Sequence, residues 1–577
     1  MLWHIGNTTV RTPYRLRTAL KVLHSSPLNG NISGREQENA FASLLHHEGV
    51  LDAPRVTRGE DASDLGRKWR VALSQLGFIT PQLTRGTASG SIDAQLEPIT
   101  NAIDELSGRP YEVTPNGLRL ANAEIITAQQ ECFLRSLASY RIPSAIETNY
   151  QGNPFSPLRH ILRIISGLSA AGHEPVLSFH EFSLFVQTSS PEDGMDNIVD
   201  TIIQYRTGRQ EAAGNVRAYD RGFYEQKAQE VNREQATLSD YADLTFRYVK
   251  ATGLFRNAGR GIGLNPSREA LSDLLLEQEL PEQTDAEYLS SLWLGAQLPT
   301  DDAVSARAVV QNLTQQANDR GIAANLPAAN TPLPELEAIR HELEDQLSKL
   351  DERDYAQTQP ASLDEILAWF DAIPTRGSVT LPNGDTVSIP KGEGPAYLEW
   401  IVWRAFLAIN SLSNEPWEAR RFQIDQDFLP VHCAPGGGPD MIFEFDNCVI
   451  VVEVTLTSSS RQEAAEGEPV RRHVAQHSTE YNKPVYGLFI AVSIDSNTAN
   501  TFRLGDWYQK DDTKLALDIV PMTLADFRSF VASGRDRFDQ MPNLLRQLLI
   551  ECRARANQDA PQWKTSISEI VGRASAV

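Results

Sequence analysis

Residues 435–455 read PGGGPDMIFEFDNCVIVVEVT, and this stretch decides the fold of the C-terminal part of the chain. Three glycines precede a lone aspartate, Asp440, and two apolar runs follow that are separated by Asp446 and Asn447. Two polar residues between apolar runs are typical of the tight turn of a β-hairpin. The second run contains Glu453, a carboxylate that is costly to bury unless a neighbouring group compensates for it. The stretch therefore predicts a hairpin with an acidic side chain near the end of its second strand.

The predicted hairpin brings two carboxylates together. Asp440 begins the first strand and Glu453 lies near the end of the second, so antiparallel pairing places both at the same end. Neighbouring carboxylates repel one another unless a cation lies between them, and Mg²⁺ is commonly bound through one or two carboxylates. Such an ion activates water for attack on a phosphodiester. The alternative is structural, with Asp440 capping a turn and Glu453 a satisfied structural carboxylate, although VVEVT offers no local group to neutralise it.

Side chains outside the hairpin extend this acidic cluster. Glu466 and His473 are seven residues apart and share one face of a helix if Pro469 does not break it. His473 is a candidate for positioning or deprotonating water, and the alternative is that both residues lie on an exposed helix face. Glu399 interrupts the apolar helix AYLEWIVW. It is a candidate for holding a metal-bound water, or it is the buried partner of an arginine such as Arg404.

Length and composition limit the class of protein. The chain has 577 residues, of which 41% are hydrophobic, and we expect several globular domains. No apolar run is long enough for a membrane span, and no apolar leader is seen, so we expect no membrane association. Four cysteines without CxxC spacing predict a reducing, cytoplasmic location. The net charge of −22 weakens a nucleic-acid interpretation, although residues 1–100 hold 11 Lys and Arg against 9 Asp and Glu.

The pattern along the chain predicts a multidomain α/β protein. Residues 1–130 contain the helical pattern DLGRKWRVALSQLGFIT and a strand-turn-helix pattern, YEVTPNGLRLANA, which are compatible with a winged-helix module and with many other small domains. Residues 131–320 show the apolar spacing of helices. Residues 321–360 predict a Pro- and Ala-rich linker and a solvated spacer helix. Residues 361–577 alternate helices and apolar strands, which predicts a mixed sheet flanked by helices.

The aspartate, the spacer and the glutamate in an apolar strand match the skeleton of the PD-(D/E)xK nuclease core. The longer stretch GGGPDMIFEFDNCVIVVEVTLTSSSRQEAAEGEPVRRHVAQH closely resembles the AlwI family of type IIS restriction endonucleases, which are related to nicking and cleaving enzymes of the BstNBI type. RKWRVALSQLGFIT and YEVTPNGLRLANA are also similar to the recognition region of that family. The resemblance spans most of the chain and is strongest over about residues 395–495.

The resemblance implies an N-terminal recognition region with winged-helix character and a C-terminal PD-(D/E)xK domain. Such an enzyme binds a short asymmetric site in double-stranded DNA and cuts a few base pairs away with Mg²⁺, for which Mn²⁺ substitutes. It implies a prokaryotic, cytoplasmic protein with a cognate DNA methyltransferase as its genetic partner. Because one active site cuts one strand, we expect transient homodimers that form through the nuclease domain.

The resemblance also assigns residues. Asp440 and Glu453 match the metal-binding pair, and the backbone carbonyl of Val454 is the third expected ligand. Glu466 and His473 match the acidic and imidazole groups of the following helix, and Glu399 matches the glutamate of the first core helix. Base and phosphate contacts need basic side chains. The N-terminal candidates are Arg11, Arg15, Arg17, Arg67, Lys68 and Arg70.

One position departs from the general nuclease motif. Thr455 stands where the motif usually has a lysine, which would orient the attacking water and stabilise negative charge. Either Glu466 and His473 replace the lysine, which we favour, or Lys483 reaches the site from beyond the helix. The departure keeps open the alternative of a catalytically weak or nicking-only protein that acts mainly by binding DNA at a specific site.

Overall fold

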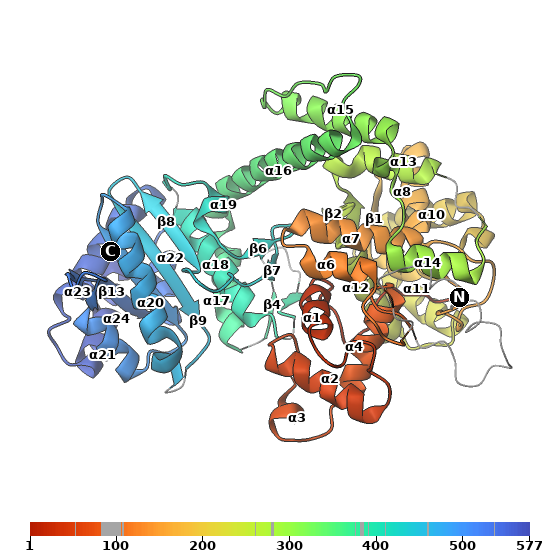
Figure 1. The fold of residues 1–577 in the computed structure, drawn as a ribbon. Coiled ribbons are helices and arrows are strands. Elements are labelled where there is room, and N and C mark those ends of the chain that lie inside the picture. Colours follow the sequence, from red (N-terminus) through yellow and green to blue (C-terminus); the bar gives the residue numbers. More distant parts are fainter. Residues whose placement is uncertain are drawn as a thin grey trace. The chain divides into compact units, whose positions relative to one another are not determined.

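A computed structural model describes residues 1–51, 53–81, 106, 109–259, 261–278, 282–375, 377–380, 386–390, 392–409, 411–458, 461–535 and 537–576. The chain divides into two compact units, Met1–Leu347 and Ser348–Val577 (Figure 1). No helix in the described part of the chain is long and apolar enough to cross a membrane. The finer boundaries predicted at residues 130, 320 and 360 stay predictions.

The first unit is mostly helical, as the apolar spacing predicts. Its described residues form an antiparallel sheet with the order β1-β3-β2. The helices, omitting 3-10 and π turns, are α1 (Arg15–His24), α2 (Arg35–His47), α3 (Pro54–Thr57), α4 (Ser63–Gln75), α6 (Pro115–Asn122), α7 (Ile126–Ser139), α8 (Pro157–Ala170), α9 (Phe179–Glu181), α10 (Met195–Glu211), α11 (Val216–Glu230), α12 (Gln235–Lys250), α13 (Glu269–Glu277), α14 (Asp285–Leu294) and α15 (Ala303–Asp319). The strands are β1 (Val176–Ser178), β2 (Phe255–Ala258) and β3 (Gly261–Leu264).

Two elements predicted near the N-terminus are confirmed. The pattern around Trp69 forms α4, in which Trp69 and Leu73 are buried. Helix α6 begins at Pro115, and the Thr114 side chain accepts a hydrogen bond from the Gly117 N–H, which caps the helix. The strand predicted in YEVT is a single antiparallel bridge between Ile79 and Val113. The winged-helix interpretation of this segment stays a prediction.

Helix α16 (Leu333–Thr358) is the predicted spacer helix, but it is not simply solvated. Arg340, Glu344 and Glu352 are each at most 6% exposed, although they are charged. Arg340 pairs with Glu131 at 2.9 Å, and Glu352 pairs with Arg420 at 2.7 Å. Charged side chains are rarely this buried unless they are paired. The alternating charges of this helix therefore include buried ion pairs as well as an exposed face.

The second unit contains a mixed four-stranded sheet with the order β13-β10-β9-β8, as the apolar strand patterns predict. Strands β13, β10 and β9 are parallel, and β8 is antiparallel to β9. Because β9 is an inner strand covered on both faces, its sequence is a nearly continuous apolar run. The helices are α17 (Leu363–Thr375), α18 (Gly394–Ile409), α19 (Pro416–Ala419), α20 (Arg461–Glu480), α21 (Ser496–Leu504), α22 (Leu524–Ala532), α23 (Met541–Ala554) and α24 (Ala560–Ala576). The strands are β4 (Ser378–Thr380), β5 (Thr386–Ser388), β6 (Gln423–Ile424), β7 (Pro430–His432), β8 (Met441–Phe445), β9 (Cys448–Thr455), β10 (Val485–Ala491), β11 (Asp506–Tyr508), β12 (Lys514–Ala516) and β13 (Asp518–Thr523).

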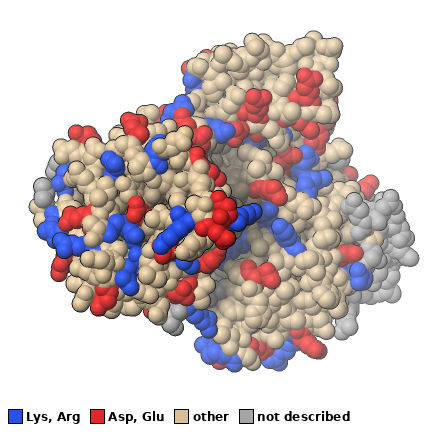
Figure 2. Space-filling model, turned by 60° about the vertical axis from the view of Figure 1, so that its left-hand side comes forward, with Lys and Arg blue, Asp and Glu red and all other residues tan. Residues whose placement is uncertain are grey.

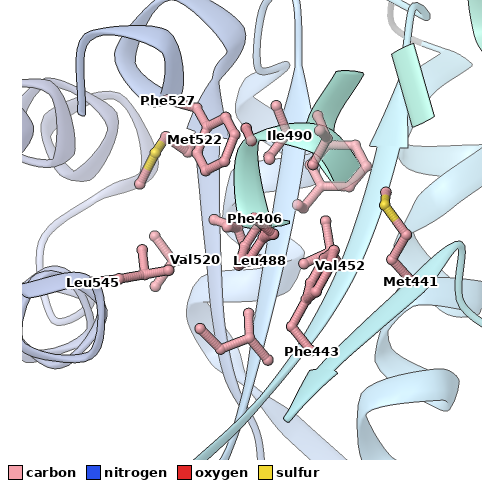
Figure 3. Close-up of a cluster of buried hydrophobic side chains, with 14 of the residues drawn as sticks. Phe406, Met441, Phe443, Val452, Leu488, Ile490, Val520, Met522, Phe527 and Leu545 are labelled. Carbon is pink, nitrogen blue, oxygen red and sulfur yellow. The ribbon is translucent and has the colours of Figure 1, made fainter. Parts of the chain in front are cut away.

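Apolar side chains from α18, α22 and all four strands pack on one side of this sheet (Figure 3). The rings of Phe406 and Phe443 stack with centroids 3.8 Å apart, and Phe527 packs against Phe406. Each fully buried side chain of this size contributes roughly 1.5–3 kcal/mol to folding. Val452 points into this cluster. Since side chains alternate along a strand, the next residue, Glu453, points to the opposite face.

Candidate active site

The hairpin has the predicted register. Phe445 pairs with Cys448 across the turn at Asp446 and Asn447, and Met441 pairs with Val452 at the far end. One step beyond the last pair, Asp440 lies opposite Glu453. The Oδ2 atom of Asp440 accepts a hydrogen bond from the backbone N–H of Val454 at 2.8 Å. Asp440 is therefore tied to the second strand, and it does not cap the preceding turn.

Helix α20 supplies the next two groups from the sheet face that Glu453 occupies. The helix runs through Pro469 without ending, so Glu466 and His473 lie on one continuous element. His473 Nδ1 lies 2.5 Å from Glu453 Oε1. Glu466 is hydrogen bonded to the Thr455 side chain. The structure therefore brings both predicted helix residues to the carboxylate hairpin.

Glu399 reaches the same cluster from α18. Its Oε2 atom accepts a hydrogen bond from the Ala434 N–H at 2.7 Å. The alternative partner, Arg404, instead pairs with Glu365 at 2.7 Å, so the interpretation of Glu399 as an ion-pair partner of Arg404 is wrong. Glu399 is buried, and this burial and the negative charge of Asp440 raise its pKa to about 9.

The other acidic groups of the site show the same trend. Burial and the charge of Glu453 raise the pKa of Asp440 to about 8. Burial and the charge of Glu466 raise the pKa of Glu453 to about 8. Burial also raises the pKa of Glu466. In the absence of a cation the site therefore holds carboxyl protons at neutral pH, because several buried carboxylates cannot all be ionised side by side.

His473 is neutral in this environment. Burial, with the positive charges of Arg472 and Arg421, lowers its pKa to about 4. When Glu453 is protonated, it donates its hydrogen to Nδ1, and the ring hydrogen is then on Nε2. Among the described residues Nε2 is buried without a hydrogen-bond partner. A buried polar atom without a partner is costly, and such atoms are often found where a ligand or water binds.

The donor set fits a hard divalent cation. Asp440 and Glu453 offer two carboxylates from adjacent strands, and Mg²⁺ in proteins typically takes one or two carboxylates and keeps several waters. The described part of the chain contains no group of three or more His, Cys, Asp and Glu side chains arranged around one ion position.

Two residues bear on the missing lysine. Lys483 donates to the Phe445 carbonyl at 2.7 Å and lies 3.5 Å from Glu444, at the turn end of the hairpin. The alternative that Lys483 reaches the site is therefore wrong, because the length of the hairpin strands separates the turn end from the end that holds Asp440 and Glu453. Arg421 was not predicted as a site residue. Its Nη1 atom donates to the Pro439 carbonyl at 3.0 Å, beside Asp440.

The basic N-terminal candidates differ in how they are held. Arg70 pairs with Glu38 at 2.9 Å and lies over the Tyr111 ring, so it serves the packing of the first unit. Arg11 pairs with Asp240 and Asp243. The remaining four are Arg15, which donates to the Val50 carbonyl, Arg17, which is half-buried, Lys68, which lies 3.8 Å from Asp64, and Arg67, which is exposed. On the face seen in Figure 2, basic side chains are interspersed with acidic ones and do not form one continuous patch.

The fold and the site together define a class, a mixed α/β domain with a cluster of buried acidic side chains at one end of a hairpin. The model of the AlwI restriction endonuclease family matches residues 74–530, well over half of the chain. The chain belongs to this family, as the sequence resemblance predicts, and membership implies that it cleaves DNA.

A similar solved structure is that of the small subunit (R.BspD6I2) of the heterodimeric restriction endonuclease R.BspD6I. It is 25% identical, the match covers 36% of this chain and 97% of that chain, and the TM-score is 0.28. Among curated proteins, no sequence matches this chain significantly.

Proposed function

We propose that the chain is a type IIS restriction endonuclease that binds a short asymmetric DNA site and hydrolyses phosphodiesters a few base pairs away with Mg²⁺. The observation that carries this proposal is the contact of Asp440 with Val454 across the hairpin, which places Asp440 opposite Glu453. We assign the second unit to the PD-(D/E)xK fold and the N-terminal segment to a winged-helix reader of DNA. A cognate methyltransferase and Mn²⁺ as a substitute ion belong to the same proposal.

Asp440, Glu453 and the carbonyl of Val454 would hold the cation, which when bound lowers the pKa of water and offsets phosphate charge. His473 changes role with the charge of Glu453. When Glu453 is ionised, Nδ1 must carry the hydrogen of their 2.5 Å contact, and Nε2 becomes an acceptor. Nε2 is then the atom that accepts a proton from the attacking water. Glu466, held by Thr455, orients that water, and Glu399 stabilises the loop at Ala434.

Cleavage of plasmid DNA in the presence of Mg²⁺ tests this function. We expect discrete fragments or site-specific nicks with the wild-type chain, and sequencing of the ends yields the site, the offset and the strand. Asp440→Ala should abolish cutting and leave specific binding of the DNA intact, measured by mobility shift in Ca²⁺. Well-folded wild-type protein that leaves DNA intact but binds it specifically would establish the alternative that Thr455 keeps open, a DNA-binding protein with a weak nuclease domain.

A further inference from the structure

Arg421 is a cation that the structure holds beside the Asp440 end of the hairpin. Its backbone N–H donates to the Asp440 carbonyl at 3.2 Å, and its Nη1 donates to the Pro439 carbonyl at 3.0 Å. The guanidinium charge acts on three groups of the site, Asp440, Glu453 and His473. Backbone and side chain are therefore both fixed to the loop that leads into the first strand.

Among the described residues Arg421 has no carboxylate partner, unlike Arg420 and Arg472. Arg420 pairs with Glu352, and Arg472 pairs with Glu468 at 3.1 Å. Across the described residues no ion pair joins Arg421 to an acidic side chain, and its one guanidinium hydrogen bond there is from Nη1 to the neutral Pro439 carbonyl. A half-buried guanidinium with donors to spare fits an anion that presents two oxygens, as a phosphate does.

The glycine-rich loop leaves the space that this arrangement needs. A Cβ atom added to Gly438 would lie 2.4 Å from Arg421 Nη1, which is far inside contact distance. A Cβ atom added to Gly436 would meet no atom within 4 Å. The absence of a side chain at residue 438 therefore allows the guanidinium to lie against the loop. A side chain at residue 436 would not touch the guanidinium.

We propose that Arg421 is a catalytic residue that binds the scissile phosphate and stabilises its negative charge in the transition state, the part that a motif lysine would play at Thr455. This inference rests on the proposed nuclease function, and it assigns the positively charged group that the motif lysine would otherwise supply. Removing one preorganised hydrogen-bond donor that points at the developing charge lowers the rate constant of an enzyme by about 100- to 1,000-fold.

Two matched pairs of variants test the proposal. Arg421→Gln removes the charge, and Arg471→Gln is its control, because Arg471 donates to the Gly467 carbonyl and lies over Trp507. Gly438→Ala keeps Arg421 but displaces it from the loop, and Gly436→Ala is its control. The readouts are the single-turnover rate constant for plasmid cleavage in Mg²⁺, the affinity for DNA in Ca²⁺, and the affinity for Mn²⁺ followed by electron paramagnetic resonance.

We expect Arg421→Gln to lower the rate constant by about 100- to 1,000-fold. Gly438→Ala should lower it at least about tenfold, and both controls should stay within about twofold of wild type. Mn²⁺ affinity should be unchanged or higher in Arg421→Gln, because a repelling positive charge is lost. A residue with a merely structural role would not separate the rate constant from metal and DNA affinity in this way.

The results separate two failures. Wild-type protein that does not cut contradicts the nuclease function itself. Wild-type protein that cuts, with a folded Arg421→Gln variant that cuts equally fast, overturns the role of Arg421. If Arg421→Gln does not fold, Gly438→Ala decides, because the added methyl displaces only the end of a flexible side chain. Equal rates for Gly438→Ala and Gly436→Ala would then overturn the proposal.

Discussion

Asp440 lies half-buried beside Glu453 and Glu466, and burial with these charges raises its pKa to about 8. An aspartate with a raised pKa in the fold contributes stability that is fully present below its ordinary pKa of 3.8. That contribution is lost as the pH rises through about 8. A side chain placed here for stability alone would not be an ionisable acid. Acids with strongly raised pKa values are typical of functional sites.

Asp440→Asn should therefore stabilise the metal-free protein, and more so at pH 9 than at pH 6. Asparagine keeps a carbonyl oxygen for the Val454 N–H but cannot ionise. We expect the gain in the free energy of unfolding to increase by at least about 1 kcal/mol between the two pH values. Chemical denaturation in a chelating buffer measures it. Asp446→Asn, in the exposed turn, is the control, and an equal gain at both pH values would contradict the raised pKa of Asp440.

At the scale of elements, two antiparallel strands and one helix make the site. The hairpin sets Asp440 opposite Glu453, and α20 adds His473 and Glu466 without a break at Pro469. The hairpin and α20 were predicted from local patterns, because periodicity and turn residues are encoded over a few neighbouring positions. Arg421 was not predicted, since an arginine in RFQID has no local pattern that marks it as a site residue.

Within the second unit, the C-terminal part of α16 forms two ion pairs of different burial. The Glu352–Arg420 pair is bidentate, with contacts of 2.7 and 2.8 Å, and Glu352 is 3% exposed. Arg353–Glu415 is a pair whose side chains are 44% and 37% exposed. Removing one partner of a buried pair leaves an uncompensated charge, whereas exposed pairs contribute little.

Glu352→Gln should destabilise the protein by about 3–5 kcal/mol, and Arg353→Gln by less than about 1 kcal/mol. The two residues are adjacent on one helix and both become glutamine, so the final residue and the helix position are matched, whereas the changes in net charge are equal in size and opposite in sign. Denaturant titrations compare the variants with wild type. Similar small losses for both would mean that the Glu352–Arg420 pair is solvated in solution. Because Arg420 precedes Arg421, we also expect slower DNA cleavage in Glu352→Gln.

At the scale of the whole molecule, one chain carries one acidic cluster of this kind in its described residues. Cutting both strands of a duplex with such a chain requires either two chains or a second binding event. The proposed transient homodimer predicts that supercoiled plasmid is first nicked, and that linear product increases more steeply than linearly with enzyme concentration. Agarose gels of a time course at several enzyme concentrations measure both products.

Mixing provides the control for this prediction. An excess of Asp440→Ala protein should allow wild-type protein to nick the plasmid but should suppress the linear product, because each mixed dimer has one active site. Linear product that forms directly at limiting enzyme, with no nicked intermediate, would contradict a transient dimer. Nicks that never become linear at any concentration would identify a nicking enzyme.

The sequence by itself determined the mixed α/β class, the hairpin register, the acidic pair and the family. All of these depend on residues close together in the chain or on long matched patterns. Only the tertiary structure decided that Glu453 meets His473, that Glu399 turns from Arg404 to Ala434, and that Arg421 lies at the site while Lys483 does not. The physical reason is that each of these contacts joins separate elements, and the packing of those elements on the sheet, rather than any local pattern, sets which side chains meet.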